Sequence, residues 1–203
     1  MAEQSNEPNH QSGGKINMEM LIAFCAVLIS VASFYATFLQ ANAAEKQVTA
    51  MTLPLMSFTT GNYDNESKSM AIKYTLWNKG VGPATIETFL IKYKSSYHSD
   101  IYEYLKDCCE QELKEFQSAR SKEPETHHLP LLVTEEPQQQ ITPSGEDIEF
   151  LLMAKHSVNA SLWDAVDNAR KDTSLAVCYC SLLDNCYWLT GKNQITEAPS
   201  CKE

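Results

Sequence analysis

Cysteine is the residue type in this sequence whose number and spacing point to chemistry. Seven cysteines occur in 203 residues, and one of them, Cys25, lies inside a long apolar run. The other six fall in the polar remainder of the chain. An even number of cysteines in a small domain, here residues 50–203, is typical of a disulfide framework. The six are Cys108, Cys109, Cys178, Cys180, Cys186 and Cys201.

The spacing of these cysteines limits how they pair. Cys178 and Cys180 stand two apart on a predicted strand, so their side chains share one face. Cys180 and Cys186 flank the residues Ser-Leu-Leu-Asp-Asn and can face each other across a hairpin loop. We favour a bridge from Cys108 or Cys109, on a predicted helix, to the face that carries Cys178 and Cys180.

A metal site is the rival interpretation of the same cysteines. Zinc and iron–sulfur sites usually carry paired C-x₂-C motifs, whereas this chain has C-C and C-x-C-x₅-C. His127 and His128 lie in a loop near prolines without ligand spacing. We therefore expect disulfides, no bound metal and no cofactor. In a cytoplasmic domain the thiols would be reduced, and the metal interpretation would gain weight.

Motifs for catalysis and nucleic-acid binding are not found in the sequence. Its five histidines form no HExxH, and its seven glycines form neither a P-loop nor a dinucleotide fingerprint. We expect no catalytic residues; an enzyme would have to use scattered groups such as Glu149, His156 and Asp164. The net charge of -10, without a Lys/Arg cluster, excludes nucleic acid as an expected partner.

One apolar segment predicts a membrane anchor. No charged residue lies between Met20 and Ala44. About 20 apolar residues form a helix that crosses a hydrocarbon core roughly 30 Å thick. We expect the helix to continue to about Thr49. We prefer an uncleaved anchor to a signal peptide cut after Ala43, because the apolar run exceeds the roughly 7–15 residues of a signal core.

One face of this helix carries small residues that permit close helix–helix contact and hence an oligomer. These residues are Ala26, Ser30, Ser33 and Thr37. An ordinary lipid-facing helix is at least as good an interpretation, because small residues are common in such spans. Lys15 and Lys46 flank the span on opposite sides, so the positive-inside rule does not orient it. The cysteines decide the orientation, because disulfides persist outside the cytoplasm. We expect a cytoplasmic N-terminus and a periplasmic or extracellular domain.

The remainder predicts a mainly β domain. We expect a disordered polar tail over residues 1–17, the helix and its extension over 18–49, and the soluble domain over 50–203. Residues 70–77 alternate apolar and polar side chains, and residues 84–93 form a return strand, which together indicate a hairpin.

Two helical patterns interrupt the strands. An amphipathic helix is expected over about 99–118, with an N-cap at Ser99-Asp100. A second short helix is expected over residues 159–170. About seven strands separated by turns favour an immunoglobulin-like β-sandwich with the first helix inserted in it.

The turn between the two strands carries a resemblance. The stretch from Tyr74 to Ala84, with Asn78, Gly80, Gly82 and Pro83 at its turn, resembles a turn of many bacterial membrane-anchored proteins of unknown function. Those proteins place a short β-sandwich after one N-terminal helix. The end of this chain, Val-Cys-Tyr-Cys-Ser followed by Cys-Tyr-Trp, is similar to the end of some of them. The resemblance implies this architecture and no activity. In the turn itself, the two glycines tolerate positive φ and the proline fixes the return.

These patterns predict a membrane-anchored extracytoplasmic binding or accessory module of unknown ligand. Its expected partners are the lipid bilayer and another membrane or envelope protein. The alternative is a thiol-active or metal-binding envelope protein that uses Cys108/Cys109 and the Cys178/Cys180/Cys186 cluster.

Overall fold

A computed structural model describes residues 17–191 and 193–201. The chain divides into two compact units, one up to Gln47 and one from Val48 onward. The disordered tail predicted for residues 1–17 lies, except for Asn17, outside the described residues.

The first unit is built on helix α1 (Met18–Met51), which has no buried residue. Among the described residues it is the one helix long and apolar enough to cross a membrane. The hydroxyl of Thr37 donates to the carbonyl oxygen of Ser33 at 2.9 Å, so this polar group is satisfied within the helix. The predicted apolar helix is therefore confirmed, and it continues two residues beyond the expected end at Thr49.

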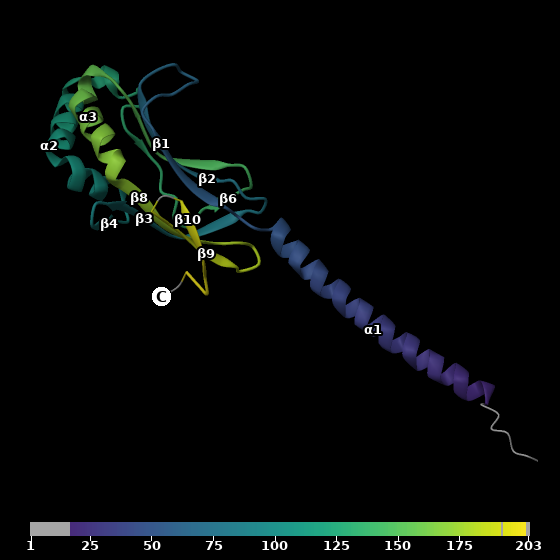
Figure 1. The fold of residues 1–203 in the computed structure, drawn as a ribbon. Helices are drawn as coiled ribbons and strands as arrows, with labels where there is room; N and C mark the ends of the chain where they lie inside the picture. The colour runs from purple at the N-terminus through teal and green to yellow at the C-terminus, as the bar shows by residue number, and fades with distance from the viewer. Residues whose placement is uncertain (1–16, 192, 202–203) are drawn as a thin grey trace, which may run out of the picture. The chain divides into compact units, whose positions relative to one another are not determined.

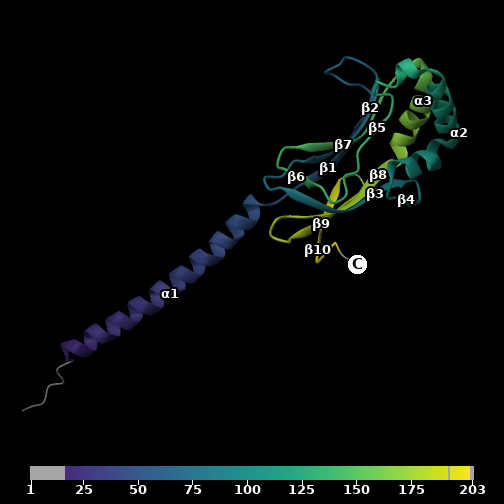
Figure 2. The same cartoon turned by 180° about the vertical axis from the view of Figure 1, so that it is seen from behind.

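The second unit consists mainly of two antiparallel sheets, drawn in Figures 1 and 2. The strand order is β1-β2-β7-β5 in the first sheet and β10-β9-β8-β3-β4 in the second, where β6 also pairs with β3. The strands are β1 (Met56–Gly61), β2 (Ala71–Asn78), β3 (Ala84–Tyr93), β4 (Ser96–His98), β5 (Val133–Thr134), β6 (Ile141–Thr142), β7 (Asp147–Ala154), β8 (Thr173–Cys180), β9 (Cys186–Gly191) and β10 (Gln194–Ala198). The prediction of a mainly β domain after an apolar helix is confirmed. The two sheets do not by themselves establish the immunoglobulin-like type.

Aromatic rings fill the core between the sheets. Phe150 of β7, fully buried, contacts Phe89 of β3 with ring centroids 5.0 Å apart, so the two sheets share one core. Phe58 and Tyr74, from β1 and β2, pack on the same ring. Offset and edge-to-face aromatic pairs of this kind add stability beyond the area they bury.

Two helices pack against each other at one end of the β domain, as Figures 1 and 2 show. They are α2 (Ile101–Lys122) and α3 (Ala160–Ala169); the short 3₁₀ segments are Pro124–Thr126, Ser157–Asn159 and Arg170–Asp172. The Asp100 side chain accepts from the backbone N–H groups of Tyr102 and Glu103, which confirms the predicted N-cap of α2. The helix ends four residues later than expected. Its Tyr104 hydroxyl lies 2.8 Å from that of Tyr74, which ties α2 to β2.

The predicted hairpin over residues 70–93 is wrong. Strand β2 pairs with β1 and β7, whereas β3 pairs with β8, β4 and β6, so the turn crosses from one sheet to the other. Asn78 is fully buried at this crossover. Its Nδ2 donates to the carbonyl oxygens of Gly82 (2.8 Å) and Thr142 (3.0 Å). Its Oδ1 accepts from the N–H groups of Leu55 (3.2 Å) and Gly80 (3.0 Å). The side chain therefore holds three segments together.

The two crossover glycines serve close approach rather than positive φ. Neither is among the positive-φ residues of the described chain. A Cβ added at Gly82 would lie 2.1 Å from the carbonyl oxygen of Thr52, and one added at Gly80 would lie 2.4 Å from that of Leu53. The backbone that follows α1 thus lies directly on the crossover, at a distance that only glycine permits.

We predict that Gly82→Ala destabilises the domain, because backbone atoms block the added methyl group. The free energy of unfolding of the full chain in detergent, followed by tryptophan fluorescence in denaturant, should fall by about 1–3 kcal/mol. Gly61→Ala is the matched control, since an added Cβ there meets no heavy atom within 4 Å. It should change the free energy by less than about 0.5 kcal/mol. Equal effects of the two substitutions would contradict this role of the crossover.

Candidate functional site

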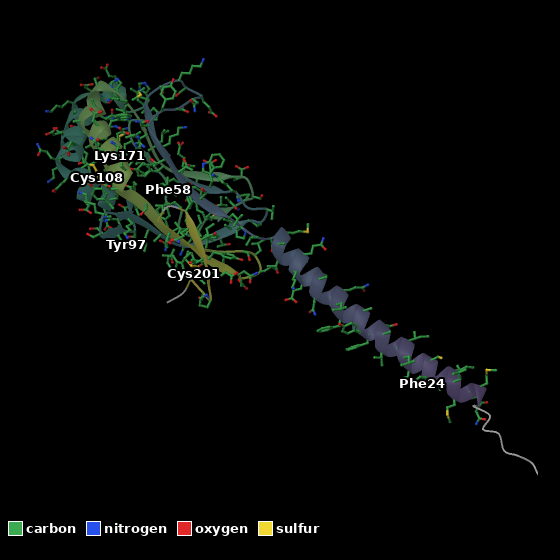
Figure 3. The ribbon with its side chains drawn as sticks, in the orientation of Figure 1. Phe24, Phe58, Tyr97, Cys108, Lys171 and Cys201 are labelled. Atoms are coloured by element: carbon green, nitrogen blue, oxygen red, sulfur yellow. A yellow bond between two sulfur atoms is a disulfide. The ribbon has the colours of Figure 1, made fainter. Side chains whose placement is uncertain are left out.

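Four cysteines gather where β8 ends, and we call them the sulfur cluster: Cys178, Cys180, Cys186 and Cys201. Cys178 and Cys180 lie on β8, and Cys186 is the first residue of β9, directly opposite Cys180 in the register. Cys201 follows β10 and returns to the same place; Figure 3 shows it beside the yellow C-terminal strands. The predicted C-terminal hairpin is confirmed and brings these residues together.

All six cysteines of the domain stand in three pairs at disulfide distance. The pairs are Cys108–Cys109, Cys178–Cys201 and Cys180–Cys186. The expected facing of Cys180 and Cys186 across the hairpin loop is confirmed. Cys25, in α1, has no disulfide partner among the described residues.

The favoured bridge between α2 and β8 is wrong. Tyr104 of α2 contacts the hydroxyl of Thr173 at the start of β8, whereas Cys178 lies five residues further along the strand. A strand advances about 3.3 Å per residue, which puts Cys178 some 16 Å from that contact. Figure 3 shows Cys108 on α2, well away from Cys201. The two cysteines of α2 therefore pair with each other, and the backbone of Cys109 leaves helical geometry there (φ -151°, ψ 39°).

The two bridges of the sulfur cluster touch each other. The Sγ atoms of Cys180 and Cys201, which belong to different bridges, are 3.5 Å apart. The Sγ atoms of Cys180, Cys186 and Cys201 all lie within 4.8 Å of one another. As free thiolates, three sulfurs at this spacing match a soft metal ion such as Zn²⁺ or Cu⁺. In the bridged state they have no thiolate to donate, so metal binding would require reduction first.

A small cleft opens beside the cluster. It has a volume of about 260 Å³ and is lined by Cys180, Cys186 and Cys201 together with Thr85, Glu87, Ser181, Asp184, Pro199 and Ser200. The Glu87 and Asp184 carboxylates give it a negative potential, which attracts cationic groups. Its volume lies at or below the lower end of small-molecule sites, so it suits a side chain or a peptide segment.

Two contacts fix the β9–β10 hairpin and β8 to the first sheet. The Phe58 backbone N–H donates to Oδ1 of Asn193 (2.6 Å), and Nδ2 of Asn193 donates to the Phe58 carbonyl oxygen (3.0 Å). The amide of Asn193 thus pairs with β1 as a neighbouring strand would. The Met56 N–H donates to the Tyr179 hydroxyl at 3.4 Å. Burial raises the pKa of Tyr179 to about 12, so its hydroxyl remains neutral at physiological pH.

The scattered acid–base candidates are held by separate partners. Glu149 pairs with Lys73 at 3.2 Å, and Asp164 pairs with Lys155 at 2.6 Å. The His156 ring accepts from the Val158 N–H at the start of a 3₁₀ turn. None of the three lines the cleft at the sulfur cluster. The structure gives the scattered-site enzyme hypothesis no support from these residues.

The cleft contains residues that sequence reasoning missed. Asp184 lies in the loop between Cys180 and Cys186, so its position in the sequence could have identified it as a residue of this site. Glu87 lies on β3 and Thr85 is opposite Cys180 in the register, a pairing visible only once the partner of β3 is known. No protein family, curated protein or solved structure matches this chain.

We predict that the bridges differ in their contribution to stability. Cys178–Cys201 spans 23 residues of sequence, so replacing both with alanine should lower the free energy of unfolding by about 3 kcal/mol. Replacing Cys108 and Cys109 with alanine should lower it by only about 1 kcal/mol, from lost packing, because bridged neighbours close no loop. Guanidinium denaturation without reductant measures both. A larger loss from the α2 pair would contradict this ranking.

Proposed function

We propose that this chain is a single-pass membrane protein with a cytoplasmic N-terminus, whose β domain is a binding or accessory module in the periplasm or outside the cell. The observation that carries the proposal is the pairing of all six domain cysteines at disulfide distance. Such bridges persist in oxidising compartments and are reduced in the cytosol. An apolar helix before the domain supplies the anchor.

We further propose that the domain is an immunoglobulin-like sandwich that presents its ligand site at the end of β8. Two antiparallel sheets around one aromatic core support this type. In such sandwiches the loops at the sheet ends bind, while the strands hold them in place. The cleft beside the sulfur cluster lies at such an end, between the β8–β9 loop and the segment after β10.

The proposed partner is another membrane or envelope protein that offers a cationic side chain to this cleft. Glu87 and Asp184 supply the complementary charge. The anchor adds a second contact surface, because Ala26, Ser30 and Ser33 are exposed on α1, where small residues let helices approach closely. The lipid bilayer surrounds the rest of the span.

The alternative function is a thiol-active protein, and one observation favours it: the 3.5 Å contact between two bridges at the cleft. The related metal-binding function needs reduced cysteines. The described domain has all six in pairs.

We predict that protease added to intact cells, or to spheroplasts if the cell has an outer membrane, digests the β domain. Two epitope tags, one before residue 17 and one after residue 203, report on the two sides of the membrane. The C-terminal tag should disappear and the N-terminal tag should survive, because only the tail before the anchor is shielded by the membrane. Survival of the C-terminal tag under conditions that digest an exported control protein would contradict the proposed orientation.

We predict that neutralising the cleft weakens partner binding. The double substitution Glu87→Gln and Asp184→Asn should reduce the partner recovered with the full chain from mild detergent by about tenfold, since each lost charge pair removes up to about 1 kcal/mol. The control, Glu110→Gln with Glu115→Gln on α2, removes the same charge elsewhere and should leave recovery unchanged. A chain that purifies alone, or equal losses in both variants, would contradict the proposed site.

A further inference from the structure

We propose that the sulfur cluster is a thiol–disulfide exchange site that oxidises a dithiol, meaning two cysteines of a protein or peptide substrate. The inference goes beyond binding and needs only that the domain is kept oxidised. Sulfurs of two different bridges, those of Cys180 and Cys201, are in contact beside a cleft, and Cys178, the partner of Cys201, is fully buried.

The four cysteines differ in whether they line the cleft. Cys180, Cys186 and Cys201 line the cleft, whereas Cys178 does not line it and is fully buried. The cleft thus opens onto the Cys180–Cys186 bridge, whose two residues are each only about 9% exposed. The Cys178–Cys201 bridge presents only one of its sulfurs, Cys201, and that sulfur lies 3.5 Å from Cys180.

This arrangement defines an ordered exchange. A substrate thiolate attacks Sγ of Cys186, which forms a mixed disulfide and releases Cys180 as a thiolate. The Cys180 thiolate attacks the adjacent Sγ of Cys201, which forms a Cys180–Cys201 bridge and releases Cys178, and Cys178 takes up a proton. The second thiol of the substrate then attacks the first substrate sulfur, which is bonded to Cys186 in the mixed disulfide. This forms the substrate disulfide and releases Cys186, which is also protonated.

The electrons and protons balance over these steps. The substrate dithiol loses two electrons and two protons and leaves as a disulfide. The cluster gains them as the thiols of Cys178 and Cys186 and retains one bridge, Cys180–Cys201. The attack of Cys180 on Cys201 matters because it consumes the Cys180 thiolate before that thiolate can return to Cys186 and expel the substrate.

The cleft electrostatics shorten the lifetime of the released thiolate. Glu87 and Asp184 line the same cleft and raise the free energy of a thiolate released beside them. A displaced Cys180 thiolate is therefore driven to form a new bond. The same charges favour a substrate whose cysteines are flanked by lysine or arginine.

Two single substitutions test the exchange without any substrate. In the full chain, Cys186→Ser leaves Cys180 as a thiol beside Cys201, and Cys178→Ser leaves Cys201 as a thiol beside Cys180. Both variants should contain a Cys180–Cys201 bridge, with Cys178 free in the first and Cys186 free in the second. Acid quenching, alkylation and non-reducing peptide mapping identify the bridges. Cys109→Ser is the control, and it should leave both cluster bridges unchanged.

The oxidising activity is tested with a synthetic dithiol peptide flanked by lysines. The initial rate of peptide disulfide formation with the wild-type chain should exceed that with the Cys178→Ala/Cys201→Ala variant by about tenfold or more, because that variant keeps the cleft bridge but lacks the second step. Circular dichroism confirms that each variant is folded. The proposal is overturned if either single variant retains its original remaining bridge, with no Cys180–Cys201 bridge, or if the peptide rates are equal.

Discussion

The buried side chain of Asn78 organises the β domain. An amide has two donor hydrogens and an acceptor oxygen, and here Nδ2 makes two hydrogen bonds and Oδ1 accepts two. These bonds join the segment after α1, the crossover between the sheets and the end of β6. Strand β3 begins directly after the crossover, and Thr142, which accepts from Asn78, pairs with Ala84 at the start of that strand. A polar group that is costly to bury unpaired is thus fully paired where the chain enters the second sheet.

The sulfur cluster links the covalent structure of the domain to its compartment and its chemistry. One bridge closes the hairpin between β8 and β9, and the other returns the end of the chain to β8. Bridges that constrain the chain stabilise it only where thiols are oxidised. The same placement leaves three sulfurs beside two carboxylates at the surface. The stabilising framework and the proposed exchange site are therefore parts of one arrangement.

The sequence predicted the elements whose signals are local. The uncharged apolar run gave α1, Asp100 marked the start of α2, and the spacing of Cys180 and Cys186 marked the hairpin of β8 and β9. It did not predict which sheet each strand joins, because Gly80, Gly82 and Pro83 specify a change of direction and not a partner strand. Strand β10 (Gln194–Ala198) was missed because its five residues are too few, and mostly too exposed, for a burial pattern. The pairing of Cys108 with Cys109 depends on the distance in space from α2 to the end of β8. The spacing of the cysteines along the chain does not reveal that distance.

The number of free thiols in the native protein tests the central claim, that the β domain is a fully bridged body outside the cytoplasm. The chain is extracted from its own membrane in the presence of an alkylating agent, fully denatured with more of the agent but no reductant, and weighed intact. Six paired cysteines in the domain predict one adduct, on Cys25, which has no disulfide partner in the described part of the chain. Seven adducts, one for every cysteine in the chain, would mean a reduced domain and would contradict the claim.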